Sequence, residues 1–76
     1  MGAEQGPDSM RVLLRNMNTG LFFQNDQGWT ATRMEARNFN HSTAAIEFTL
    51  AADLHGVEVV FSFDDAQYDV RVPCRA

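Results

Sequence analysis

The alternation of hydrophobic and polar residues predicts four β-strands. Residues 10–15, 57–63 and 68–72 each alternate with a period of two, which is typical of strands that bury one face. Residues 21–24 follow a stretch rich in Asn and Gly, so they are predicted to return as the second strand of a hairpin. Pro73 is expected to end the last strand, because it has no backbone N–H to donate.

One helix is predicted between the two hairpins. Ser42 or Thr43 can cap a helix that extends to about His55, and Gly56 supplies a stop signal. His55 in the last turn would suit the helix dipole. The element order is therefore ββαββ, which predicts an α+β domain with one helix packed on a four-stranded antiparallel sheet. A helical crossover that returns beside the first strand gives the strand order 2-1-3-4.

The chain is predicted to form a single domain behind a short leader. Residues 1–9 are small and polar and show no period, so we expect a flexible leader there and one domain over residues 10–76. Residues 25–28 and 64–67 combine Asp, Asn, Gln and Gly in ways that favour turns.

Hydrophobic residues occur on both faces of the predicted sheet. The opposite face to the helix should be polar, but Leu13, Val60 and either Phe22 or Phe23 must point away from the helix. The face toward the helix is predicted to carry Val12, Leu14, Leu21, Phe23, Val57, Val59, Phe61, Phe63, Tyr68, Val70 and Val72.

The predicted helix also has two apolar sides. At 100° per residue, Ile46, Leu50 and Leu54 form a stripe that is separate from a second, small-residue arc. Only one side can meet the sheet, so the other is exposed or is covered by another part of the chain. The small-residue arc consists of Ala44, Ala45, Phe48, Ala51 and Ala52.

Two interpretations of the extra apolar residues remain open. The segment 30–40 has no clear period, and its Met34 and Phe39, together with Trp29, could fold over the second stripe of the helix. Alternatively, one apolar surface is an association site, and symmetric self-association is the commonest use of such a surface. The partner is then either a second copy of the chain, which gives a homo-oligomer such as a dimer, or another protein. The predicted interface residues are Leu13, Phe22, Val60, Ile46, Leu50 and Leu54.

Composition restricts the class of protein and its partners. With 76 residues and 45% hydrophobic content, the chain has room for one folded core. Cys74 is the only cysteine, so no disulfide can form within the chain. No apolar run reaches the length of a membrane span or a signal peptide, so we expect a cytoplasmic protein without a membrane partner. The net charge of −4 disfavours general binding to nucleic acid.

An arginine-bearing sheet face is the basis of the alternative function. Arg11, Arg15 and Arg71 are predicted to share the outer face with exposed apolar residues, an arrangement that several RNA-binding modules use. Glu58 and Asp69 are predicted on the same face, however, and cross-strand ion pairs are the simpler explanation. A small nucleic-acid-associated regulator therefore stands as the alternative to an interaction domain.

The sequence lacks the common signatures of catalysis. His41 and Ser42 are neighbours at a helix start, where they resemble a cap more than a nucleophile and its base. Cys74 lies near the chain end, away from the structured positive setting that activates a thiol. There is no P-loop and no glycine-rich fingerprint. We therefore predict that the protein is not an enzyme and needs no cofactor.

Metal ligands are also poorly arranged in the sequence. Asp64, Asp65 and Asp69 surround a predicted turn without the alternation and central Gly of an EF-hand loop. His41 and His55 are expected at opposite ends of one helix, so they cannot share a metal ion within one chain. No metal is expected.

Several turn and core residues together resemble those of small uncharacterised bacterial α+β proteins. The resemblance is carried by the stretches 19–23 (Thr-Gly-Leu-Phe-Phe), 28–30 (Gly-Trp-Thr), 36–39 (Ala-Arg-Asn-Phe) and 57–60 (Val-Glu-Val-Val), and it covers residues 10–73. It implies a shared fold, in which Trp29 and the Phe of the third stretch are structural. It implies no activity, ligand or catalytic residue.

Overall fold

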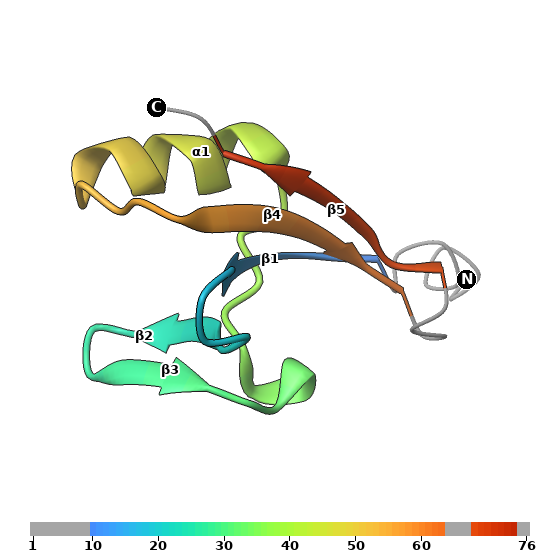
Figure 1. The fold of residues 1–76 in the computed structure, drawn as a ribbon. Helices are drawn as coiled ribbons and strands as arrows, with labels where there is room; N and C mark the ends of the chain where they lie inside the picture. Colours follow the sequence, from blue (N-terminus) through green and yellow to red (C-terminus); the bar gives the residue numbers. More distant parts are fainter. Residues whose placement is uncertain (1–9, 64–67, 75–76) are drawn as a thin grey trace.

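The computed structural model describes residues 10–63 and 68–74, which form a five-stranded antiparallel sheet with one α-helix (Figure 1). The α+β class is confirmed, but the predicted four strands in ββαββ order were wrong in detail because an additional strand follows the first hairpin. The predicted leader and the predicted turn at 64–67 lie outside the described residues. In chain order the elements are β1 (Arg11–Asn16), β2 (Phe22–Asn25), β3 (Gly28–Thr30), the 3-10 helix η3 (Arg33–Glu35), α1 (Ser42–Ala51), β4 (Val57–Ser62) and β5 (Val70–Pro73).

The strands lie in the order β3-β2-β1-β4-β5. The four predicted strands thus have the predicted order 2-1-3-4, and β3 is added at the edge beyond β2. The backbone N–H of Gln27 donates to Asn25 Oδ1 (2.8 Å), which tightens the turn that leads into β3. Trp29 then lies opposite Phe23, and their rings pack edge to face with centroids 5.5 Å apart.

The central strand β1 is paired unequally with its two neighbours. It pairs with β4 over its whole length, from Arg11 opposite Ser62 to Asn16 opposite Val57. It pairs with β2 only beside the connecting turn, where Arg15 is opposite Phe22. The two strands of the first hairpin therefore separate away from the turn and leave a gap between them.

The segment 37–39 fills the gap between β1 and β2. The backbone N–H of Arg37 donates to the carbonyl of Phe23 on β2 (3.0 Å), and that of Phe39 donates to the carbonyl of Val12 on β1 (2.8 Å). Asn38 Oδ1 accepts a further bond from the Val12 N–H (3.0 Å). The chain thereby passes from one face of the sheet to the other through the sheet itself.

The larger core lies between α1 and the sheet. Three phenylalanines form its centre, with the Phe48 ring 4.9 Å from that of Phe23 and 5.3 Å from that of Phe39. Part of the small-residue arc of α1 meets the sheet, since Ala45 is fully buried, whereas Ala51 and Ala52 are exposed. Thr49 is buried beside it, and its hydroxyl is satisfied because it donates to the Ile46 carbonyl (2.6 Å). The buried members of this helix-face core are Val12, Leu14, Phe23, Phe39, Ala45 and Val59.

A second core lies on the opposite face of the sheet. Leu13, Phe22 and Val60 are buried there together with Ala36, which follows η3. These are the residues that the hydrophobic pattern directs away from the helix. They are covered because the chain from η3 to Ala36 crosses this face before it passes between β1 and β2.

The ends of α1 differ from the prediction. His41 is the N-cap residue and no side chain hydrogen-bonds there, so neither Ser42 nor Thr43 caps the helix. The helix ends at Ala51 instead of near His55, one turn earlier than expected.

A left-handed residue other than glycine explains the early end of α1. Asp53 has a φ of 57°, a conformation that short polar side chains tolerate, and the Leu54 N–H closes the end by donating to the Thr49 carbonyl (2.9 Å). Gly56, with a φ of 70°, serves the turn into β4 and not the helix stop.

Candidate functional site

Half of the predicted interface is buried in the folded chain. Leu13, Phe22 and Val60 are 0%, 8% and 2% exposed, because the segment from η3 to Ala36 lies over them. The expectation that they form an exposed apolar surface was therefore wrong. They stabilise the second core instead.

The other half of the predicted interface lies on α1 and is largely open. Ile46 is 43% exposed and Leu50 is 61% exposed, while Leu54 is half-buried. The interpretation in which Trp29, Met34 and Phe39 cover this stripe was wrong, because those residues lie elsewhere. Met34 is itself 77% exposed on η3, and the two aromatic side chains pack in the helix-face core.

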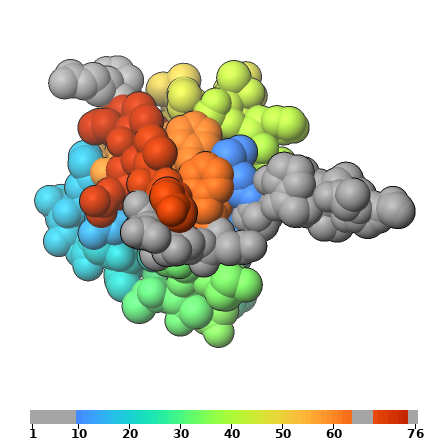
Figure 2. Space-filling view, turned by 90° about the vertical axis from the view of Figure 1, so that its right-hand side faces the viewer, coloured from blue at the N-terminus to red at the C-terminus, as the bar shows by residue number. Residues whose placement is uncertain are grey.

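The exposed stripe of α1 continues onto strand β5. Val70 and Val72 are 50% and 47% exposed, and they lie on the same sheet face as α1 because they pair with Phe61 and Val59. A groove of about 170 Å³ runs between the helix and the strand, floored by Val59 and bounded by Pro73 and Cys74. Figure 2 shows β5, in red, at the surface beside β4, in orange. We call Ile46, Leu50, Leu54, Val70 and Val72 the α1–β5 surface.

The geometry of the sheet explains why this surface stays open. A helix with its side chains is about 10–12 Å wide, whereas five strands at about 4.8 Å spacing span roughly 19 Å between the outer strands. The principal contacts of α1 with the sheet are with β1 and β4. Strand β5 therefore extends beyond the helix. Val70 and Val72 were predicted on the buried face, and only the width of the helix relative to the sheet could have indicated their exposure.

Two of the three arginines in the alternative function have partners within the protein. Arg11 donates to the backbone carbonyls of Arg33 and Ala36, both at 2.7 Å. Arg15 lies 2.6 Å from the Glu58 carboxylate, a side chain only 9% exposed. Arg71, on β5, is exposed.

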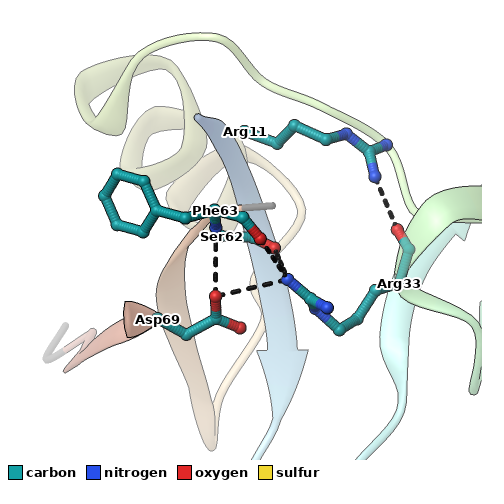
Figure 3. A network of polar contacts seen from close by, with 5 residues as sticks. All are labelled: Arg11, Arg33, Ser62, Phe63 and Asp69. Atoms are coloured by element: carbon teal, nitrogen blue, oxygen red, sulfur yellow. Dashed lines mark hydrogen bonds and ion pairs between the residues drawn. The ribbon is translucent and has the colours of Figure 1, made fainter. Parts of the chain in front are cut away.

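Arg33 holds η3 against the end of β4 (Figure 3). Arg33 donates through Nη2 to the Ser62 hydroxyl, the Phe63 carbonyl (2.8 Å) and Asp69 Oδ1 (3.2 Å). The same carboxylate oxygen accepts from the Phe63 N–H (3.0 Å). With the contacts of Arg11, this network fixes the cover of the second core, and we assign it a structural role.

The candidate metal and nucleophile residues are dispersed in the part of the chain that the structure describes. His41 precedes α1, and His55 follows it in an exposed pair with Asp53 (2.9 Å). Among residues 10–63 and 68–74, no three His, Cys, Asp or Glu side chains are grouped to hold a metal ion. Asp64 and Asp65 lie outside the described residues. The histidines are therefore surface residues at separate ends of α1.

Cys74 lines the groove of the α1–β5 surface. Burial raises the pKa of its thiol, and a weaker effect from the Val59 backbone lowers it. A raised pKa leaves less thiolate at neutral pH, so the thiol is a poor nucleophile here. We treat Cys74 as a packing residue of the groove.

Comparison with known proteins yields no relatives. No family model, curated protein or solved structure matches the chain. The resemblance to small bacterial α+β proteins therefore stays a prediction. Within the described residues, α1 is too short and no other helix is apolar and long enough to cross a membrane.

Proposed function

We propose that this protein is a non-catalytic interaction or assembly domain that self-associates through the α1–β5 surface. The observation that carries the proposal is the exposure of four large aliphatic side chains on α1 and β5, between 43% and 61% each, of which Ile46, Leu50 and Val72 line one groove. Apolar surface of this kind, gathered on two neighbouring elements, is typical of association sites. A cytoplasmic location agrees with this proposal and remains part of it.

The magnitude of apolar burial supports association. Full burial of a large aliphatic side chain contributes about 1.5–3 kcal/mol, so each half-exposed side chain has roughly 1 kcal/mol to gain. Four such side chains on each of two copies would gain roughly 8 kcal/mol before the entropic cost of association. Association costs at least about 4 kcal/mol of entropy, so roughly 4 kcal/mol remains, which corresponds to millimolar affinity; hydrogen bonds and ion pairs across the interface must supply the rest of a micromolar dimer.

The alternative, a small nucleic-acid-associated regulator, is less well supported. Binding to phosphates needs free guanidinium groups, and the groups of Arg11 and Arg15 are already engaged with carbonyls and with Glu58. Releasing them would uncover the second core or leave a buried carboxylate without its partner. Arg71 alone would be a weak nucleic-acid site.

Sedimentation equilibrium at several concentrations, in low and high salt, tests the proposal. We expect a concentration-dependent dimer that changes little with salt, because apolar association does not rely on charge. Phosphate binding would instead weaken steeply as salt rises. A chain that remains monomeric at hundreds of micromolar would contradict self-association.

A matched pair of substitutions tests the surface itself. Leu50→Glu is expected to abolish the dimer and leave the circular dichroism spectrum unchanged, because Leu50 is 61% exposed. Met34→Glu is the control, since Met34 is a similarly exposed apolar residue on η3, outside the α1–β5 surface. A dimer that survives Leu50→Glu would show that α1 lies outside the interface and would restrict the proposed surface to β5.

A further inference from the structure

Among residues 10–63 and 68–74, no strand pairs with the side of β5 that faces away from β4. The Cys74 N–H donates to the Val57 carbonyl (3.1 Å), and hydrogen-bonded pairs alternate along an antiparallel ladder. The backbone groups of Val70 and Val72 therefore point toward β4. Those of Arg71 and Pro73 point away from the sheet, and the same alternation extends to Asp69, which precedes the strand.

The outer edge of β5 differs from the edge at the other side of the sheet. The opposite edge is β3, which has three residues, and very short strands are poor templates for pairing. Strand β5 has four residues, all of them exposed. Pro73 interrupts its edge, because proline offers no N–H at an outward position.

From this edge we infer the partner and its register: a second copy of the chain pairs β5 with β5 in antiparallel fashion, with Val70 opposite Val70 of the second copy. This inference rests on the proposed self-association. It is a two-fold arrangement in which the same surface serves both copies. The two sheets then form one continuous sheet, and both α1–β5 surfaces lie on the same face of it.

Backbone hydrogen bonding and charge together favour this register over its neighbours. With Val70 at the two-fold axis, Asp69 pairs with Arg71 of the second copy and Arg71 with Asp69, so neither of these pairs contains a proline. Shifting the second copy by two residues would place Arg71 opposite Arg71, and Asp69 opposite Pro73. A further shift would place both arginines opposite prolines. The first alternative makes no fewer backbone hydrogen bonds but sets like charges directly opposite each other, and the second loses half of the bonds.

Charge complementarity selects the same register. Each Asp69–Arg71 pair across the interface joins opposite charges, and the two-fold axis creates the pair twice. Asp69 is already positioned for this, because Arg33 and the Phe63 N–H hold its Oδ1. None of the hydrogen bonds in the described part of the chain uses Oδ2, which remains as an acceptor for the guanidinium of Arg71.

The apolar side chains also match in this register. Val70 meets Val70 of the second copy at the two-fold axis, so two half-exposed apolar side chains pack against each other across the interface. A continuous apolar row therefore crosses the interface and joins the grooves beside the two α1 helices. The alternation of β5 thus places its charged pairs on one face of the joined sheet and its apolar pairs on the other.

Disulfide trapping tests the register, because each register brings a different pair of positions together. Residues at the axis form a non-hydrogen-bonded pair with Cα atoms about 4.5 Å apart, within the range that a disulfide spans. In the proposed register, positions 72 of the two copies are about 14 Å apart along the strands, beyond that range. Val70→Cys and Val72→Cys are each made in a Cys74→Ala background, and circular dichroism verifies folding.

The expected result is that Val70→Cys forms a disulfide dimer under mild oxidation at least roughly tenfold faster than Val72→Cys. A disulfide only in the mixture of the two variants would indicate the register with Arg71 opposite Arg71, and faster trapping of Val72→Cys would indicate the next shift; either overturns the inference.

If sedimentation shows a dimer but neither variant nor the mixture is trapped, the dimer uses another part of the surface, so the inference fails and the proposed function stands. A monomer refutes both the inferred register and the proposed self-association. The edge of β5 would then be tested for binding an extended segment of another protein.

Discussion

The stability of Val60→Ala tests whether the second face of the sheet is a true core. Val60 is 2% exposed and packs with Leu13, Phe22 and Ala36. The substitution removes two methyl-sized groups, which costs about 1.6 kcal/mol at about 0.8 kcal/mol each. The cavity left behind, a few tens of Å³, adds roughly 1 kcal/mol. We therefore expect Val60→Ala to lower the free energy of unfolding by about 2–3 kcal/mol.

Urea unfolding followed by circular dichroism measures this loss, with Val70→Ala as the matched control. Val70 is the same residue type on the adjacent strand but is 50% exposed, so its truncation should cost less than about 0.8 kcal/mol. Both variants are compared at dilute concentration, where association contributes little. Equal costs, within about 0.5 kcal/mol, would mean that the segment from η3 to Ala36 does not cover this face and would refute the reasoning.

Two further predictions concern the polar network and the thiol. Arg33→Met removes the guanidinium group that joins η3 to Ser62, Phe63 and Asp69. We expect urea unfolding to show that the free energy of unfolding falls by about 1–2 kcal/mol, a figure that allows for the partial exposure of the Arg33–Asp69 pair. A loss within error would mean that the cover of the second core holds without Arg33. Burial raises the pKa of the Cys74 thiol, so between its unfolded and folded pKa values the folded state binds more protons. Stability should therefore fall as pH rises through this window, and this part of the fall should disappear in Cys74→Ala.

The strands that bury a face could be predicted from the sequence alone. Alternation identified β1 and β4, and the helical crossover predicted that they would be neighbours. Strand β3 could not be predicted in the same way, because its three residues are too few to show a period. Its formation depends on the Asn25 turn and on packing of Trp29 against Phe23.

The candidate surface was predictable only in part, because the burial of some predicted residues depends on tertiary contacts. The periodicity of α1 separated Ile46 and Leu50 from the arc that meets the sheet, and both are exposed. The burial of Leu13 and Val60 depends on a segment without periodicity, held by long-range contacts of Arg11 and Arg33. No pattern of neighbouring residues encodes such contacts.

The passage of residues 37–39 through the sheet makes the two cores a single cooperative unit. Ala36 packs in one core and Phe39 in the other, only three residues apart, while the backbone between them is bonded to both β1 and β2. Because residues 37–39 form a short link, local unfolding of either core displaces them and disturbs the packing of the other core. Each core alone is too small to be stable in a domain of this size. The link through residues 37–39 therefore makes the two cores unfold together in one transition. It also fixes the length of this stretch, since an added residue would misplace either Ala36 or Phe39.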